Sequence, residues 1–374
     1  MRPCYFILCT VVGLLLPPAY CSGAAYSITG LGTISGYDTK TVPTAINSSG
    51  QVVGVAQSDT TNSLPYHAFL YSNGSIHDLQ TFGGTNSRAD GINQSGEVVG
   101  TANLPASGGN PEQSQAFVYN GAGLQPLGSL VPGGASQGWG INNLGQVVGN
   151  SATSTNSQLF NTVFLYSAGG MQDLGNLGAL SSSITAGQIN DSGQMAGTYF
   201  QASNNAPRGF VYSGGVLQTI GTFGGSQSFA RAMNSSGQVV GFADLSGDTI
   251  IHAFLFDGTM HDLGALQSPG GSVGLGINNL GQVVGIANVG NASHAFLYSG
   301  GPLVDLNSLI NPASGWVLNS ADVINDLGQI AGEGTFGGQN RAFLLTPVPE
   351  PSSVILAALG IVGLLALGWR RRQR

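Results

Sequence analysis

The chain has 374 residues, of which 60 are glycine, 16 are proline and only 27 are charged, 10 basic and 17 acidic. Glycine is therefore more than twice as frequent as in an average protein, and charged residues fall far below the usual quarter. An apolar content of 42% argues against a disordered chain, and a net charge of −7 without a basic stripe argues against nucleic acid as a partner. The glycines have no period of three, which excludes collagen. A glycine-rich, all-β protein with a neutral polar surface remains.

The first 24 residues have the features of a secretory signal peptide. Arg2 supplies a positive start, an apolar stretch of eleven residues runs from Phe6 to Leu16, and two prolines follow it. Such a stretch is too short to span a membrane as a helix but suits the core of a signal. All three cysteines lie in this segment, so we expect the exported chain to have no disulfide framework and no cysteine metal site.

After this segment, one sequence unit recurs seven times. Its first block is Asn-x-x-Gly followed by Gln (Glu97 once), two apolar or small residues and Gly, as in QVVG at Gln51–Gly54. The second block reads HAFLY at its fullest, as at His67–Tyr71, and the third is a run such as DLQTFGG from Asp78. The block asparagines, 44 to 49 residues apart, are Asn47, Asn93, Asn142, Asn190, Asn234, Asn278 and Asn325. The block phenylalanines are Phe69, Phe117, Phe164, Phe210, Phe254, Phe296 and Phe343.

Together these blocks resemble the HAF-repeat family of bacterial extracellular proteins, over about residues 28–345. The local sequence predicts four short strands in each repeat, with glycine and proline dense between them. Asn-x-x-Gly fits a four-residue turn with Asn first and Gly fourth, and runs such as FLY fit a strand buried on both faces. Four strands in about 45 residues, with burial between neighbouring units, predict a β-propeller.

The two ends of the repeat region predict how the propeller closes. The chain starts with the fourth strand of one unit, near Tyr26–Ile34, and stops after the third strand of another, at Ala342–Leu345. Joining the two ends gives seven complete units. A ring gains from this division, whereas an open solenoid would need distinct caps. We therefore expect residues 25–346 to form one seven-bladed β-propeller closed by an N-terminal strand.

The last 28 residues, 347–374, form a tail of a different kind. Pro349, Glu350 and Pro351 come first, and sixteen uncharged, mostly apolar residues follow from Val354 to Trp369. As a helix these would span about 24 Å, slightly short of the ~30 Å hydrocarbon core of a bilayer. The closing arginines should stay cytoplasmic, so the body faces outward; they are Arg370, Arg371, Arg372 and Arg374.

This order of features resembles the PEP-CTERM sorting signal of exopolysaccharide-producing Gram-negative bacteria. The resemblance implies that an exosortase recognises the tail and cleaves near Pro349-Glu350-Pro351. It also implies that the C-terminal transmembrane helix anchors the protein only transiently in the inner membrane, before release or attachment at the cell surface. The alternative is a permanent tail anchor.

Loop lengths predict where a ligand would bind. The Asn-x-x-Gly turn has the same length in all seven repeats, whereas the connections at the opposite face vary, from 17 residues between Gly100 and Phe117 to 11 between Gly285 and Phe296. Variable loops on a rigid scaffold usually carry binding, so we assign the site to that face. Trp139 and Trp316, in two of the crossovers between blades, are the predicted ligand residues because aromatic rings stack on sugars. Alternatively, each packs between blades.

Other residues that could carry chemistry are better explained by the repeat. His67, His252 and His294 occupy one position in different repeats, and Arg208 and Arg341 replace them elsewhere, which argues against metal binding. The acidic set Asp78, Asp173, Asp262 and Asp305 is repeated in the same way, and glycoside hydrolysis would need two carboxylates set about 5–10 Å apart. No nucleophile, zinc or phosphate-loop motif occurs. We predict no catalytic residue, no metal and no cofactor.

The sequence thus predicts an exported, non-catalytic propeller at the cell surface or in the extracellular matrix. Its expected partner, besides the exosortase, is a polysaccharide or a surface protein, in a role linked to exopolysaccharide or biofilm. Two alternatives remain: a propeller enzyme, a lyase or glycosidase acting on extracellular polysaccharide, and a structural coat component. Between Ser22 and Pro347 there are 16 acidic and 5 basic residues, a charge of about −11 that disfavours anionic partners at close range.

Overall fold

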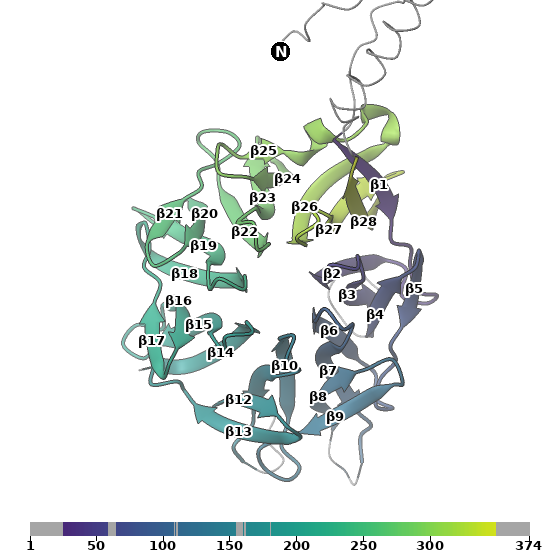
Figure 1. Cartoon of the computed structure of the whole chain (residues 1–374), viewed down its shortest axis with the longest axis vertical. Helices are drawn as coiled ribbons and strands as arrows, with labels where there is room; N and C mark the ends of the chain where they lie inside the picture. Colours follow the sequence, from purple (N-terminus) through teal and green to yellow (C-terminus); the bar gives the residue numbers. More distant parts are fainter. Residues whose placement is uncertain are drawn as a thin grey trace, which may run out of the picture.

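The computed structural model describes residues 25–58, 65–107, 109, 111–154, 160, 162–179 and 181–348. They form seven four-stranded antiparallel sheets, which stand as blades around a central axis (Figure 1). The predicted all-β, seven-bladed propeller is therefore confirmed. In the described ranges there is no α-helix, and no helix is long and apolar enough to cross a membrane. The predicted signal peptide and C-terminal transmembrane helix lie outside these ranges.

Each repeat supplies one blade, and its first strand is the innermost one. Blade 1 consists of β2 (Lys40–Ile46), β3 (Val52–Gln57), β4 (Tyr66–Ser72) and β5 (Ser75–Asp78). Blade 2 consists of β6 (Ser87–Ile92), β7 (Val98–Leu104), β8 (Gln113–Tyr119) and β9 (Leu124–Gly128). Blade 3 consists of β10 (Ser136–Ile141), β11 (Val147–Ser151), β12 (Thr162–Ser167) and β13 (Gly170–Gly175). Blade 4 consists of β14 (Ser181–Ile189), β15 (Met195–Gln201), β16 (Pro207–Ser213) and β17 (Val216–Thr219).

The remaining blades follow the same order. Blade 5 consists of β18 (Gly224–Met233), β19 (Val239–Leu245), β20 (Ile251–Phe256) and β21 (Met260–Asp262). Blade 6 consists of β22 (Ser272–Ile277), β23 (Val283–Val289), β24 (Ala292–Tyr298) and β25 (Val304–Asp305). Two short 3-10 helices, η1 (Leu306–Leu309) and η2 (Pro312–Ser314), lead to blade 7. Blade 7 consists of β26 (Trp316–Ile324), β27 (Ile330–Phe336), β28 (Gln339–Pro347) and β1 (Tyr26–Gly30).

Blade 7 therefore combines strands from both ends of the described chain. β1 pairs antiparallel with β28, from Tyr26 opposite Pro347 to Gly30 opposite Phe343, and the two lie side by side in Figure 1. The Val348 amide donates to the carbonyl of Ala25 at 2.9 Å, which continues the pairing. A side chain at Gly328, in the last Asn-x-x-Gly turn, would lie 3.3 Å from the Pro347 ring. Both ends of residues 25–348, which we call the body, are thus at the face of the propeller where these turns lie.

The core lies between neighbouring blades. All seven phenylalanines of the HAFLY-type block are fully buried. Each hydrophobic cluster joins side chains of adjacent sheets: Phe69 and Val52 of blade 1, for example, pack with Ala331 and Leu344 of blade 7. Burial of both faces of each sheet explains why apolar residues follow one another in these strands instead of alternating.

The innermost strand of every blade contains a β-bulge, three residues before the block asparagine. The seven unpaired residues are Thr44, Asp90, Trp139, Gly187, Arg231, Leu275 and Asp322. The bulge explains the glycine that ends the QVVG-type block. A Cβ on Gly54 would lie 2.0 Å from the carbonyl oxygen of Val42 and 2.8 Å from the Phe69 ring, and the six equivalent glycines are as tightly confined. No side chain fits there.

The Asn-x-x-Gly turns are the predicted four-residue turns, and they join the blades to one another. In blade 3, the Gly145 amide donates to the Asn142 carbonyl at 3.1 Å, and the Asn142 Oδ1 accepts from the amides of Leu144 and Gln146. The Asn142 Nδ2 donates to Gln146 Oε1 at 2.8 Å and to the carbonyl of Asn190, in the next blade, at 3.0 Å. Each asparagine side chain thus spans an interface between blades.

The same bond recurs at every interface. Nδ2-to-carbonyl distances are 2.9–3.5 Å around the ring, and the last bond runs from Asn325 in blade 7 to Asn47 in blade 1. All seven side chains are almost fully buried. The bonds therefore form a closed circle at the inner edge of the blades.

We expect Asn142→Ala to lower the free energy of unfolding by about 1–3 kcal/mol, because it leaves buried backbone groups without partners. Chemical denaturation of the purified body would measure the change. Leu144→Ser is the matched control: Leu144 is 69% exposed, and four other repeats carry serine at that position, so its effect should stay within about 0.5 kcal/mol. Equal effects of the two substitutions would contradict this role of the asparagine.

Candidate functional site

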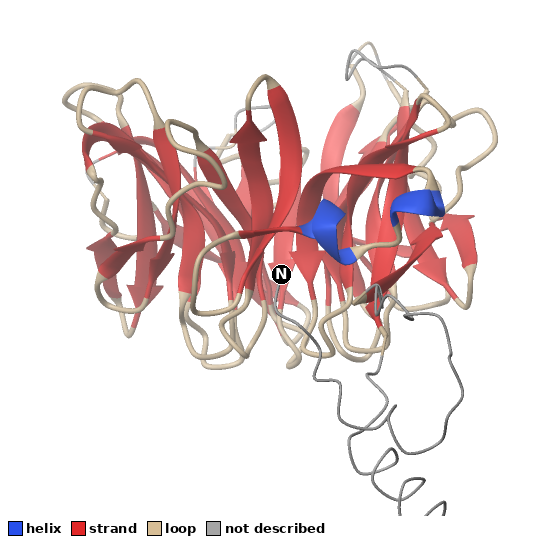
Figure 2. Ribbon diagram, turned by 90° about the horizontal axis from the view of Figure 1, so that it is seen from above, coloured by secondary structure: helices blue, strands red, loops and turns tan. Residues whose placement is uncertain are grey.

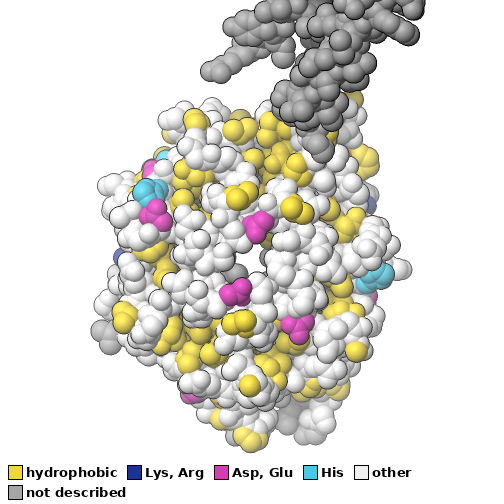
Figure 3. All heavy atoms as spheres, in the orientation of Figure 1, with side chains coloured by type: hydrophobic (Ala, Val, Ile, Leu, Met, Phe, Trp, Pro, Cys, Tyr) yellow, Lys and Arg dark blue, Asp and Glu magenta, His cyan; other side chains and the backbone are white. Residues whose placement is uncertain are grey.

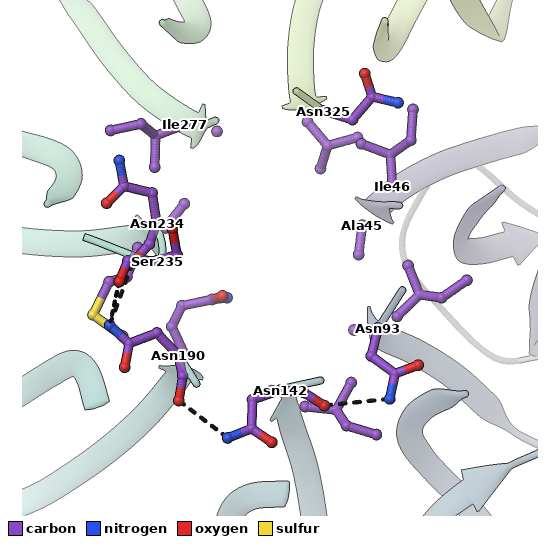
Figure 4. A pocket seen from close by; sticks show the side chains of 18 of the residues that line it. Ala45, Ile46, Asn93, Asn142, Asn190, Asn234, Ser235, Ile277 and Asn325 are labelled. Atoms are coloured by element: carbon purple, nitrogen blue, oxygen red, sulfur yellow. Dashed lines mark hydrogen bonds between the residues drawn. The ribbon is translucent and has the colours of Figure 1, made fainter. Parts of the chain in front are cut away.

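A cavity of about 250 Å³ lies on the propeller axis. Its lining includes the residue after each block asparagine, so it opens at the face of the Asn-x-x-Gly turns. Figure 4 shows side chains of the innermost strands and turns around this space, among them Asn93, Asn142 and Asn190. In the space-filling view of Figure 3 the ring has a central opening with acidic side chains close to it. We call this cavity the axial pocket.

The axial pocket is layered from its mouth inward. The mouth is a ring of short polar side chains, namely Ser48, Gln94, Asn143, Asp191, Ser235, Asn279 and Asp326. Six of these side chains form a hydrogen bond to the neighbouring turn. Asn143, for example, donates to the Asp191 carboxylate from its backbone amide at 2.8 Å and from its Nδ2 at 2.9 Å. Below the block asparagines lies a layer of isoleucines, with Met233 in one blade. The deepest layer comes from the bulges.

The bulge residues give the pocket its chemical diversity. A β-bulge redirects a side chain out of the regular sheet, and such bulges are frequent beside functional sites. Thr44, Asp90, Trp139, Arg231 and Leu275 all line the axial pocket, whereas the positions beside them are mostly small residues repeated from blade to blade. The asparagines that join the blades are thus the same in every repeat, whereas the bulge residues that line the pocket differ.

Trp139 is held in place by polar contacts. Its Nε1 donates to Asn150 Oδ1 at 3.1 Å, and the Arg88 guanidinium lies 5.1 Å from the centre of its ring. Arg88 also binds the Asp90 carboxylate, with Nε 2.8 Å from Oδ1. Trp139 is half-buried and is among the residues that line the axial pocket. A cation against an aromatic face contributes about 0.5–2 kcal/mol, which favours one fixed orientation of the ring.

Two carboxyl groups at equivalent bulges have strongly raised pKa values. Burial raises the pKa of Asp90 from 3.8 to about 6, although Arg88 opposes the rise. Burial raises the pKa of Asp322 to about 8, and the Glu333 carboxylate adds to the rise. The Asp322 Oδ2 has no hydrogen-bond partner in the described part of the chain, and Asp322 is not among the pocket residues. Asp322 is therefore a buried acid that favours the neutral form.

The repeated histidines are structural. His67 Nδ1 lies 2.8 Å from Asp78, His252 Nδ1 lies 2.9 Å from Asp262, and His294 Nδ1 lies 2.6 Å from Asp305. Each pair links the third strand of a blade to the fourth. In blade 3, Thr162 takes the place of the histidine and donates to Asp173. Across the described residues no cluster of three or more His, Cys, Asp or Glu could hold a metal ion.

The structure corrects the predicted positions of the two tryptophans. Trp139 lies within β10 and Trp316 is the first residue of β26, so neither is in a crossover. Only Trp139 lines the axial pocket. Trp316 stacks on Phe336 at 5.1 Å and meets Phe343 edge-on at 6.0 Å, both in its own blade, and it packs against the hydrophobic cluster that blades 6 and 7 share. The pocket also lies at the face opposite the variable loops, which are longer and less regular than the turns in Figure 2.

The pocket could not be located from loop lengths, but two signals in the sequence point to its structure. The residue three before each block asparagine differs widely in size and charge from repeat to repeat, while the positions on either side of it are mostly alanine or glycine, which marks the bulges. Repeats with aspartate opening the third block carry His or Thr two residues before the block phenylalanine, whereas the other repeats carry Gln or Arg there. That covariation predicts the pairs between strands.

Comparison with known proteins separates the tail from the body. Residues 347–372 match the PEP-CTERM protein-sorting motif. The chain ends in a PEP-CTERM sorting motif. The match begins at Pro347, the last residue of β28. Its predicted key residues, Pro349, Glu350, Pro351, Arg370, Arg371 and Arg372, lie outside the described residues. The motif identifies an exported protein and implies processing by an exosortase.

The repeats have more distant relatives. Residues 39–130, in blades 1 and 2, match a family described as protein of unknown function (DUF3466), so the HAF-repeat resemblance stays a prediction. No curated protein sequence matches the chain. Similar solved structures include TolB from Acinetobacter baumannii (11% identity, 79% of this chain and 63% of that one, TM-score 0.46). Porphyromonas gingivalis dipeptidyl peptidase 4 is 8% identical, with 79% of this chain and 51% of that one covered and a TM-score of 0.44. Trypanosoma rangeli sialidase is 12% identical, with 80% of this chain and 59% of that one covered and a TM-score of 0.36. The chain spans less than two thirds of each.

The raised pKa of Asp322 predicts how stability depends on pH. The folded chain holds this proton more tightly than the unfolded chain, so the free energy of unfolding should fall as pH rises from about 4 to about 8. Asp322→Asn should flatten this fall, and the melting temperature between pH 4 and pH 8 measures it. Asp38→Asn, the same change at an exposed residue, serves as control. If the melting temperature of Asp322→Asn changed with pH as much as that of the unmodified protein, the raised pKa of Asp322 would be contradicted.

Proposed function

We propose that the protein is a non-catalytic binding propeller of the cell surface or extracellular matrix, and that the axial pocket takes a saccharide unit of an extracellular polysaccharide. The observation that carries the proposal is Trp139, the one tryptophan in the lining of the axial pocket, half-buried and fixed by Asn150 and Arg88. A flat apolar face beside amide and hydroxyl groups matches a sugar ring, whose C–H face stacks and whose hydroxyls form hydrogen bonds.

The carboxylates of the site support binding over hydrolysis. A glycosidase needs one carboxylic acid and one free carboxylate facing the same bond. Of the two acids with strongly raised pKa values, Asp90 is engaged by Arg88 and Asp322 is not part of the pocket lining. Two further carboxylates, Asp191 and Asp326, lie at the mouth, where each accepts hydrogen bonds from a neighbouring asparagine. The rest of the lining consists mostly of repeated small, polar and apolar residues, an arrangement that suits a binding protein. A propeller lyase or glycosidase remains the alternative that a turnover assay would reveal.

Trp139→Ala should abolish or weaken at least tenfold the binding of purified body (residues 25–348) to an array of bacterial exopolysaccharide fragments, because the stacking surface is lost. Trp316→Ala is the matched control. It should lower stability through lost packing on Phe336 and Phe343 and leave binding unchanged at a temperature where it is folded. Binding lost in Trp316→Ala but not Trp139→Ala would move the site to the other face. Shortened fragments would indicate an enzyme, and self-association without binding would favour a coat.

The sorting motif supports a proposal for where in the cell envelope the axial pocket acts. We propose that residues 354–369 hold the body at the outer side of the inner membrane until an exosortase cleaves near Pro349-Glu350-Pro351. The processed protein then acts at the cell surface or outside the cell. Because the pocket and both ends of the body share one face, the pocket faces the membrane side until cleavage. Cleavage would free that face for ligand.

We further propose that the pairing of β1 with β28 closes the ring. A chain that begins at residue 32 should melt at a markedly lower temperature than one that begins at residue 25, because β28 becomes an unpaired edge. A peptide of residues 25–34, added in excess, should restore part of the difference, whereas a scrambled peptide should not. Equal melting temperatures for the two chains would show that the ring does not depend on this strand.

A further inference from the structure

Arg231 differs from every other charged residue of the axial pocket. It is the bulge residue of β18, and it is the only cationic side chain in the described lining of the pocket. Its guanidinium lies over the rings of Phe229 and Phe242, 5.9 and 5.4 Å from their centres, and these rings stack on each other at 4.9 Å. The two rings hold a planar cation in a fixed place, and Arg231 is an exposed residue.

The acids of the same pocket already have partners. Asp90 is bound by Arg88 at 2.8 Å. The Asp191 carboxylate accepts two hydrogen bonds from Asn143, and the Asp326 carboxylate accepts two from Asn279, at 2.7–2.9 Å. Among the described residues, the side chain of Arg231 makes no hydrogen bond and no ion pair, and its contacts are with the two rings. Arg231 is therefore the one charged side chain of the described pocket lining that has no hydrogen-bond partner.

We infer that Arg231 binds a carboxylate of the ligand, and that the saccharide taken by the axial pocket is a uronic acid unit of an acidic polysaccharide. This inference rests on the proposed function of the pocket and names its ligand class. A guanidinium presents its N–H donors in a fork that matches a carboxylate in two parallel bonds. Trp139 would take the sugar face, and the mouth of amides and hydroxyls would meet its hydroxyl groups.

The negative charge of the body limits the ligand but does not exclude it. At about −11, the body repels a densely charged polyanion at long range. Inside the pocket, however, Asp90 is paired with Arg88 and the carboxylates of Asp191 and Asp326 lie at the mouth, whereas Arg231 comes from the deeper bulge layer and has no ion-pair partner among the described residues. One carboxylate on an otherwise neutral, hydroxyl-rich unit fits this arrangement, whereas a phosphate monoester, which carries close to two negative charges, would be repelled more strongly by Asp191 and Asp326 at the mouth.

The test measures the affinity of the body for trisaccharides of galacturonic, glucuronic, mannuronic and guluronic acid by calorimetry. Each is compared with the same sugar after its carboxyl groups are reduced to hydroxymethyl groups. We expect at least one acidic trisaccharide to bind, and Arg231→Gln to weaken it about 10- to 100-fold. Arg231→Lys should recover only part of the loss, because it keeps the charge but not the fork. Arg208→Gln removes the same charge outside the pocket and should have no effect.

The outcomes separate this inference from the proposed function. If reduced and acidic sugars bind equally, or if Arg231→Gln binds as the unmodified protein does, the carboxylate assignment is wrong. Should Trp139→Ala still abolish binding in that case, the saccharide pocket itself stands. If no acidic trisaccharide binds, the inference fails. A preference for a glutamate-containing tripeptide that depends on Arg231 would also overturn it and identify a protein ligand. Circular dichroism confirms that each variant is folded.

Discussion

The hydrogen bond from an asparagine side chain to the carbonyl of the next blade is the interaction on which the rest of the structure depends. Each of these asparagines shapes its own turn through Oδ1 and joins the next blade through Nδ2, so one residue sets both local and long-range geometry. Seven such bonds close on themselves when Asn325 reaches Asn47. They hold the inner strands at a fixed spacing, and that spacing defines the axial pocket.

Much of this architecture could be predicted because the same sequence pattern occurs seven times in the chain. The turn follows from Asn and Gly at fixed separation, the blade from four short strands, and the pairing of β1 with β28 from a unit divided between the two ends. The roles of single block residues follow only from the structure. Gly54, opposite Phe69, is required because the bulge places the Val42 carbonyl where a Cβ would lie. The bulge occurs in every repeat, so it leaves no difference in block length by which the sequence could reveal it.

The candidate site was harder to predict for the same reason. Loop lengths predict a ligand site at the variable face, because variable loops on a rigid scaffold usually carry binding. The pocket instead lies at the face of uniform turns, and its diversity comes from single bulge residues such as Trp139 and Arg231. Trp316, which the sequence could not separate from Trp139, packs against Phe336 because it begins its strand instead of lying at the bulge.

Hydrogen exchange of the folded body, measured by mass spectrometry, would test the closed ring most directly. In a ring without ends, amides of the inner strands β2 and β26 should be as protected as those of β14, since every blade has two neighbours. In an open array, protection would decline from the middle blades toward the terminal ones, because end units unfold first. Uniform protection around all seven blades is the result that the account predicts, and a graded one would contradict it.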